Sequence, residues 1–283
     1  MKTFSIKDEL HRIRLREAER EKRSSLLLDR TDPRDFVSRH LSCQSGFCRA
    51  CVAQGFLSQE QMQHAVMRYR LGVTRSGGVI FWQIGLQGQV YDGKVMHYHS
   101  DCHRDHSHHP SWVISMLKGF YDCPVDIPHV HCLFGTHLLA HTDDSLSLAD
   151  SADSAERGFV NEACVVEAEK TAVIMSEHYP QQLWLAAGGL NELTPQKLFP
   201  LRGRRIILFP DTDPDGKAFR LWYDIALKAQ WLMGQNIFVS PLLEQHATPE
   251  QKQRKIDLVD FLFEGHTEST ESTEMGAALV VKQ

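Results

Sequence analysis

The sequence has no hydrophobic run long enough to cross a bilayer, and its first residues lack the apolar core of a secretion signal. It also lacks a strong excess of one charge, because the formal net charge is only −5. A helicase-type phosphate loop, GxxxxGK[ST], does not occur. The seven cysteines follow no regular framework, which favours reduced thiols over disulfides. These absences predict a cytoplasmic protein without membrane contact, in which any nucleic-acid binding is local.

With 283 residues, the chain is long enough for two modest domains. Residues 1–30 are dense in alternating charge, which predicts an exposed charged helix, with a nucleic-acid-binding arm as the alternative. Residues 141–158 are polar, acidic and serine-rich, which is typical of a linker. We therefore expect an α+β domain over 31–140 and a second domain over 159–265, followed by a disordered tail over 266–283.

The first domain has the pattern of an antiparallel meander. Short β-branched and aromatic runs over 69–72, 77–84 and 88–98 are separated by glycine. A short buried helix is predicted over 112–117. Between them lies a histidine-rich stretch over 97–109. Such a stretch can bind metal, but its irregular spacing favours a solvated hairpin loop.

A cysteine-rich segment precedes the meander. Cys48 and Cys51 have the C-x-x-C spacing that supplies two zinc ligands, and Cys43 or His40 could be a third. The second ligand pair of a zinc ribbon is missing nearby. Free cysteines that pack as small hydrophobic residues are therefore the favoured interpretation, and zinc the weaker one.

The second domain alternates strands and helices. We expect strands over 163–167, 183–187, 205–209 and 236–240, and helices over 169–178, 194–200, 216–233 and 256–264. This alternation is typical of an α/β fold with a parallel sheet flanked by helices.

Carboxylates lie at the ends of two of these strands. Glu167 is the last residue of the first predicted strand, and Asp211 and Asp213 follow the third. The carboxyl ends of parallel strands meet at one edge, so we expect these side chains to converge. Carboxylate oxygens suit Mg²⁺, which completes its shell with water and substrate phosphates. The alternative is structural: a helix N-terminal glutamate, and a Pro-Asp-Gly turn that caps the next helix.

The same residues resemble the toprim domain of bacterial and phage-type DNA primases. That family has a strand ending in Glu and a later strand ending in Asp-x-Asp, with Gly three residues on, as in 166–172 (VEAEKTA) and 211–218 (DTDPDGKA). Residues 186–190 (AAGGL) resemble its glycine turn, and 255–262 (KIDLVDFL) its acidic-aromatic close. Upstream, 79–90 and 132–140 are similar to the platform of the primase core and to the turn into toprim. The chain also resembles toprim-like proteins carried on bacterial mobile elements.

The resemblance implies roles for individual residues. Glu167 would act as general acid or base, Asp211 and Asp213 would bind Mg²⁺ or Mn²⁺, and Asp215 would add a ligand. Two further residues are expected to contact phosphate: Lys170, and Gly216 at the helix start. Each also has a plain interpretation, as a solvated lysine and a turn glycine.

The implied function is Mg²⁺-dependent nucleotidyl transfer on single-stranded DNA or a primer-template, in replication or mobile-element transfer. A replicative helicase is a further expected partner. The chain departs from the family in Ala168, where glycine is usual, and in lacking a recognisable zinc module. Two alternatives therefore stay open: a catalytically silent module that binds single-stranded DNA or a replication partner, and a toprim-type nuclease.

Overall fold

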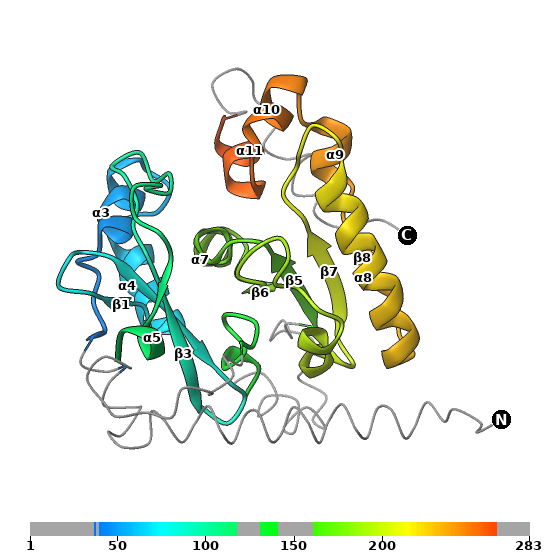
Figure 1. Ribbon diagram of the computed structural model, residues 1–283, viewed down its shortest axis with the longest axis horizontal. Coiled ribbons are helices and arrows are strands. Elements are labelled where there is room, and N and C mark those ends of the chain that lie inside the picture. The colour runs from blue at the N-terminus through cyan, green and yellow to red at the C-terminus, as the bar shows by residue number, and fades with distance from the viewer. Residues whose placement is uncertain (1–36, 38–39, 118–130, 141–160, 265–283) are drawn as a thin grey trace, which may run out of the picture. The chain divides into compact units, whose positions relative to one another are not determined.

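The computed structural model describes residue 37 and residues 40–117, 131–140 and 161–264 (Figure 1). The predicted helix over 1–30, the linker over 141–158 and the tail over 266–283 lie outside these ranges. The chain divides into two compact units, Met1–Leu148 and Ala149–Gln283. No helix within the described ranges is both long enough and apolar enough to span a bilayer.

The first unit contains the predicted antiparallel meander, but of the run expected over 69–72 only Gly72 is in a strand, because Tyr69 still belongs to the preceding helix. Its sheet has the order β1-β2-β3-β4, with β1 at Gly72–Val73, β2 at Val79–Ile84, β3 at Val90–Met96 and β4 at Ser111–Trp112. The predicted helix over 112–117 is α5, Val113–Leu117, and Trp112 belongs to β4 instead. Within the described residues, the helices before the sheet are α3 at Gly46–Ala53 and α4 at Gln59–Tyr69.

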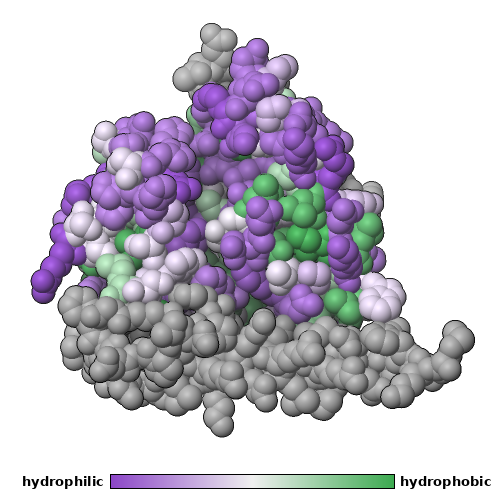
Figure 2. Space-filling model, viewed as in Figure 1, coloured by the Kyte–Doolittle hydropathy of each residue, from purple (hydrophilic) through white to green (hydrophobic). Residues whose placement is uncertain are grey.

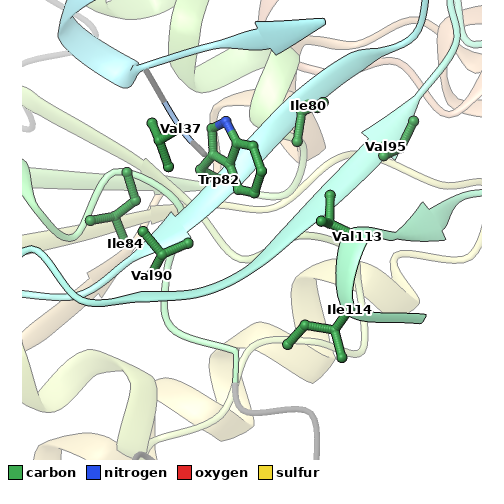
Figure 3. Packing of buried hydrophobic residues seen from close by; sticks show 8 residues of the cluster. All are labelled: Val37, Ile80, Trp82, Ile84, Val90, Val95, Val113 and Ile114. Atoms are coloured by element: carbon green, nitrogen blue, oxygen red, sulfur yellow. The ribbon is translucent and has the colours of Figure 1, made fainter. Parts of the chain in front are cut away.

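Strand β2 is buried on both faces of this sheet. Successive side chains of a strand point to opposite faces. Phe81 packs edge-on against Phe134, with ring centroids 5.4 Å apart. The residues on either side of Phe81 join a hydrophobic cluster (Figure 3), which consists of Val37, Ile80, Trp82, Ile84, Val90, Val95, Val113 and Ile114. The sheet therefore holds one core on each face.

Strand β3 carries a glycine opposite a tryptophan of β2, so the indole can pack directly on the β3 backbone. Trp82 pairs with Gly93 in the antiparallel register. A Cβ atom at Gly93 would lie 2.7 Å from Ile80 Cγ2 and 2.8 Å from the Trp82 ring. The hydrophobic cluster on this face therefore requires glycine at position 93.

The second unit is the predicted parallel α/β sheet. Its four strands have the order β6-β5-β7-β8, with β5 at Glu162–Val166, β6 at Leu183–Ala186, β7 at Arg205–Phe209 and β8 at Ile237–Val239. The connecting elements are α7 (Glu169–His178), the 3-10 helix η1 (Gln196–Leu201) and α8 (Lys217–Met233). The crossovers through α7 and α8 run in opposite directions along the sheet. Right-handed connections therefore place these helices on opposite faces.

Three helices follow β8 in the stretch up to residue 264 that the structure describes. They are α9 at Leu242–His246, α10 at Pro249–Arg254 and α11 at Leu258–Glu264. Only α11 is predicted from the sequence, as 256–264. Helix α10 begins at a capping box, in which Thr248 Oγ1 accepts from Gln251 N and Gln251 Oε1 accepts from Thr248 N.

Helix α8 leaves an apolar stripe in solvent. Tyr223, Leu227 and Trp231 are spaced four residues apart and are 49%, 48% and 65% exposed. Phe238, on the edge strand β8, is also exposed. Figure 2 shows apolar residues gathered over the part of the second unit that holds β7, β8 and α8.

Candidate metal and phosphate site

The predicted adjacency of the Glu167 and Asp211 strands is confirmed. Strands β5 and β7 pair in parallel, with Val166 opposite Phe209. Glu167 follows β5 directly, and Asp211 comes two residues after β7. The chain leaves β5 toward β6 and leaves β7 toward β8, so the two carboxylates flank the point where the winding reverses. Open α/β sheets bind ligands at this point.

Asp211 and Glu167 interact electrostatically at this edge. Burial raises the pKa of Asp211 well above its ordinary value of 3.8, and Glu167, Asp257 and Asp260 raise it further. Lys170 acts in the opposite direction. Three carboxylates and one ammonium thus act electrostatically on a fourth carboxylate. The arrangement concentrates negative charge where a cation would be stabilised.

Lys170 lies in a buried ion-pair network. Its Nζ is 3.2 Å from Asp257 Oδ2 and 3.5 Å from Asp260 Oδ1. Thr171 Oγ1 donates to the same Asp257 Oδ2 at 2.6 Å. Burial opposes ionisation of Asp257, but Lys170 and the Thr171 hydroxyl outweigh it and lower the pKa of this carboxyl. The ammonium predicted to meet phosphate therefore pairs with two aspartates of this network.

Asp213 caps the turn that leads into α8. Its Oδ1 accepts from Asp215 N at 2.9 Å and Lys217 N at 3.1 Å, and its Oδ2 accepts from Ala218 N at 2.7 Å. Burial acts to raise the pKa of Asp213, and these three N–H groups outweigh it and lower the pKa. Asp215 forms an exposed ion pair with Lys217. Asp213 thus has the arrangement of a capping residue, Asp215 pairs with a lysine of the same turn, and metal binding by either stays a prediction.

Gly216 has the backbone conformation that its position requires. Its φ of +64° lies in the left-handed region, where a side chain is strained. Its N–H donates to Asp213 O at 3.2 Å. At the start of α8, the N–H groups of Lys217 and Ala218 already meet the Asp213 carboxylate. The predicted place for a phosphate is thus filled by a side chain of the same turn.

The glycine turn after β6 meets the same edge. Gly188 N donates to Glu167 O at 3.0 Å, and Gly188 has φ +95°. A Cβ atom on Gly188 would lie 3.4 Å from Oε1 of the buried Glu169. Three loops, after β5, β6 and β7, therefore line one rim of the sheet.

The metal implied for this edge is Mg²⁺. In the part of the chain that the structure describes, no three His, Cys, Asp or Glu side chains are grouped to hold an ion. Mg²⁺ needs fewer protein ligands, because one or two carboxylates suffice when water and phosphates complete its shell. Glu167 and Asp211 supply this donor type at the rim, so the residues fit Mg²⁺.

The cysteine segment lies in the first unit. Cys48 and Cys51 are buried on α3, and Cys51 Sγ lies 3.3 Å from Cys102 Sγ. Burial raises the pKa of Cys48 to about 11. Cys43 is half-buried, and His40 Nδ1 is 3.1 Å from Val73 O. The histidine-rich loop is organised by Asp105, which accepts from His108 Nδ1 at 2.6 Å. Metal binding at either place stays untested.

Asp257 and Asp260 were not predicted as site residues. Their segment was singled out only by its similarity to the acidic-aromatic close of primases. The contact that brings Asp257 to Lys170 joins residues far apart in sequence, on α7 and just before α11. An acidic pair spaced three apart at the start of a helix was the available signal.

Comparison with known proteins gives a family and distant structural likenesses. No curated protein matches the chain. The solved structure titled "Structure of the DnaG primase catalytic domain bound to ssDNA" is similar over 93% of this chain and 91% of its own, with 15% identity and a TM-score of 0.48. That likeness is too distant to assign an activity. A family match covers residues 52–212, more than half of the chain, and includes Glu167 and Asp211. The chain belongs to the family described as Domain of unknown function (DUF6371).

Proposed function

We propose that the protein is a toprim primase-like enzyme that carries out Mg²⁺-dependent nucleotidyl transfer on nucleic acid. One observation carries the proposal: Glu167 and Asp211 interact at the switch point of a parallel sheet, and the pKa of Asp211 is raised. A half-buried carboxylate held among like charges costs stability, and a divalent cation relieves that cost. The toprim-like order of the motifs supports the same assignment.

Each residue has a defined task in this proposal. Asp211 holds the metal, and Glu167 takes or returns the proton of the reacting hydroxyl. A bound Mg²⁺ supplies charge neutralisation on the phosphate oxygens. Lys170 balances Asp257 and Asp260 in their network 3.2 and 3.5 Å away. Asp213 orders the turn after Asp211 through its three N–H contacts, with metal binding as its further proposed role.

The proposed substrate is single-stranded DNA or a primer-template. Mobile-element replication, with a replicative helicase as partner, is the proposed setting, and the reduced thiols expected from the sequence fit the cytoplasm.

A binding module without turnover is the second candidate. Two features favour it: Lys170 is engaged by Asp257 and Asp260, and the N-terminal N–H groups of α8 are engaged by Asp213. Both groups are engaged by the protein itself at places where an active site would need them for phosphate.

One assay separates these functions. The full chain is incubated with single-stranded template, nucleotides and a labelled primer, with and without Mg²⁺, beside Glu167→Gln and Asp211→Asn. Extended or new products that require Mg²⁺ and vanish in both variants are expected. Shortened products would indicate a nuclease instead. Salt-dependent DNA binding with no product would favour the binding module.

A further inference from the structure

A cavity of about 430 Å³ lies in the first unit, open to solvent. Its size falls within the range of small-molecule sites. It lies between the C-terminal part of α4 and the 131–140 segment. The lining residues are His64, Met67, Arg68, Arg70, His137 and Leu138.

Helix α4 presents one face to this cavity. His64, Met67 and Arg68 stand at positions i, i+3 and i+4, so their side chains share a face. Tyr69 points inward and stacks on Phe134, with ring centroids 5.0 Å apart and planes 14° from parallel. This stack fixes the helix end against the 131–140 segment, so the two walls hold a defined distance.

A hydrogen bond joins the two walls directly. His137 Nε2 lies 3.0 Å from Arg68 O, and because a carbonyl only accepts, the imidazole donates. This bond satisfies one of the carbonyls that a helix leaves at its C-terminus. It also reduces the negative potential that the end of α4 would direct at an anion.

Arg70 holds a backbone conformation that disfavours a side chain. It follows α4 with φ 55° and ψ 44°, in the left-handed region, and its N–H donates to Val66 O. Glycine takes such a position without strain, whereas arginine does not. The helix dipole explains a basic residue near this end but not its placement at a strained position. A binding role for the guanidinium that lines the cavity would explain why arginine occupies this position.

The lining combines cations with an apolar surface. Arg68 and Arg70 are permanently charged, and none of the six lining residues is acidic. The chain as a whole carries a formal charge of −5, so this charge is local. Met67 and Leu138 add a soft, apolar surface, and a thioether packs well against an aromatic ring. Guanidinium groups beside such a surface suit a phosphate attached to a base.

We infer that this cavity binds a phosphate-bearing ligand of nucleotide size, with the two guanidinium groups on the phosphates and Met67 against the base. The phosphates could belong to a mononucleotide or to the backbone of a nucleic acid. The site lies in the first unit, apart from the acidic rim, and it deepens the proposed function, on which it rests, by naming a place that holds a nucleotide or a nucleic-acid backbone.

Isothermal titration calorimetry in EDTA tests this site while no divalent cation is bound at the acidic rim. The probes are ATP, inorganic tripolyphosphate, adenosine and an oligothymidylate that lacks a terminal phosphate. ATP or the oligonucleotide should bind wild type, and Arg68→Gln and Arg70→Gly should each weaken that binding about tenfold to a hundredfold. Arg70→Gly also relieves backbone strain, so its melting temperature should not fall. Binding of ATP identifies a mononucleotide site, and binding of the oligonucleotide alone identifies a backbone site.

Two matched variants control for general charge effects. Arg75→Gln removes an exposed cation of the same unit that does not line the cavity. Lys255→Gly replaces a residue with the same left-handed conformation, φ 56°, after α10. Both should bind within twofold of wild type. The inference fails if the two arginine variants bind like wild type, if Arg75→Gln weakens binding equally, or if adenosine binds as tightly as ATP. Absence of binding by all four probes would also overturn it.

Discussion

The acidic rim of the second unit and the basic cavity of the first differ in how their charge is held. At the rim, Asp211 is half-buried among like charges, and its pKa is raised. At the cavity, Arg70 is exposed, so water screens its charge. The rim should therefore store electrostatic repulsion, and removing its charge should stabilise the fold while removing function. The cavity should respond to charge removal in affinity alone.

Asp211→Asn gives the largest expected effect. We expect Mg²⁺-dependent transfer to fall about 10²- to 10³-fold, because the carboxylate that holds the metal is gone. The melting temperature should rise, since the amide removes the repulsion with Glu167, Asp257 and Asp260. Transfer assays and thermal unfolding measure the two effects. If Asp211→Asn keeps its transfer activity and is no more stable than wild type, the rim does not differ from the basic cavity in the way described above.

The pH dependence of stability sharpens this result. The pKa of Asp211 is higher in the folded than in the unfolded state, so the folded protein binds this proton more tightly. That contribution is complete below the ordinary value of 3.8 and is lost as pH rises through the folded-state pKa. The advantage of Asp211→Asn over wild type in urea unfolding should therefore grow with pH above 3.8. An advantage that shrinks with pH would contradict the assignment.

Lys170→Gln should have the next largest effect. The ammonium is buried beside Asp257, with 10% and 8% of the two side chains exposed. Removing one partner of such a pair costs about 3–5 kcal/mol. Lys217→Gln, which breaks the exposed pair with Asp215, should change the free energy of unfolding little. If the rim accepts divalent cations, added Mg²⁺ should restore part of the stability of Lys170→Gln.

In the first unit, Gly93→Ala tests packing rather than charge. The added methyl would press on Ile80 and Trp82, and overpacking of this kind costs about 1–3 kcal/mol. Gly46→Ala is the control, since its nearest contact to a new Cβ atom is 3.4 Å. Urea unfolding of both variants decides, and equal stabilities would show that β2 and β3 can separate at no cost.

Asp213→Ala gives the smallest expected change in stability. Losing the carboxylate that accepts from Lys217 N and Ala218 N should cost about 1 kcal/mol. Asp213→Asn keeps an accepting oxygen, so it should recover most of this loss. Transfer activity separates the two roles: a capping residue leaves Asp213→Asn active, whereas a metal ligand leaves both variants inactive.

Most of the sheet in the second unit follows from its sequence. Apolar runs bounded by polar residues predicted all four strands, and the alternation with helices predicted their parallel arrangement. Helices α9 and α10 were missed because they are short, and α10 buries none of its residues. Without a buried face, a helix has no apolar period to read.

The sites show a different limit. Glu167 and Asp211 could be paired from sequence, because topology alone brings strand ends together. The partners of Lys170 and the opposite walls of the basic cavity could not, because they join α7 to α11 and α4 to the 131–140 segment. Asp213 shows that a motif can also have a local use, since its carboxylate is satisfied by the N–H groups of its own turn.

Binding of Mn²⁺, followed by the electron paramagnetic resonance of the free ion, tests the acidic rim most directly. Wild type should bind the ion, and Asp211→Asn should bind it at least about tenfold more weakly, because one of its ligands is gone. Equal binding by the two proteins would contradict the account, since the ion would then be held without Asp211.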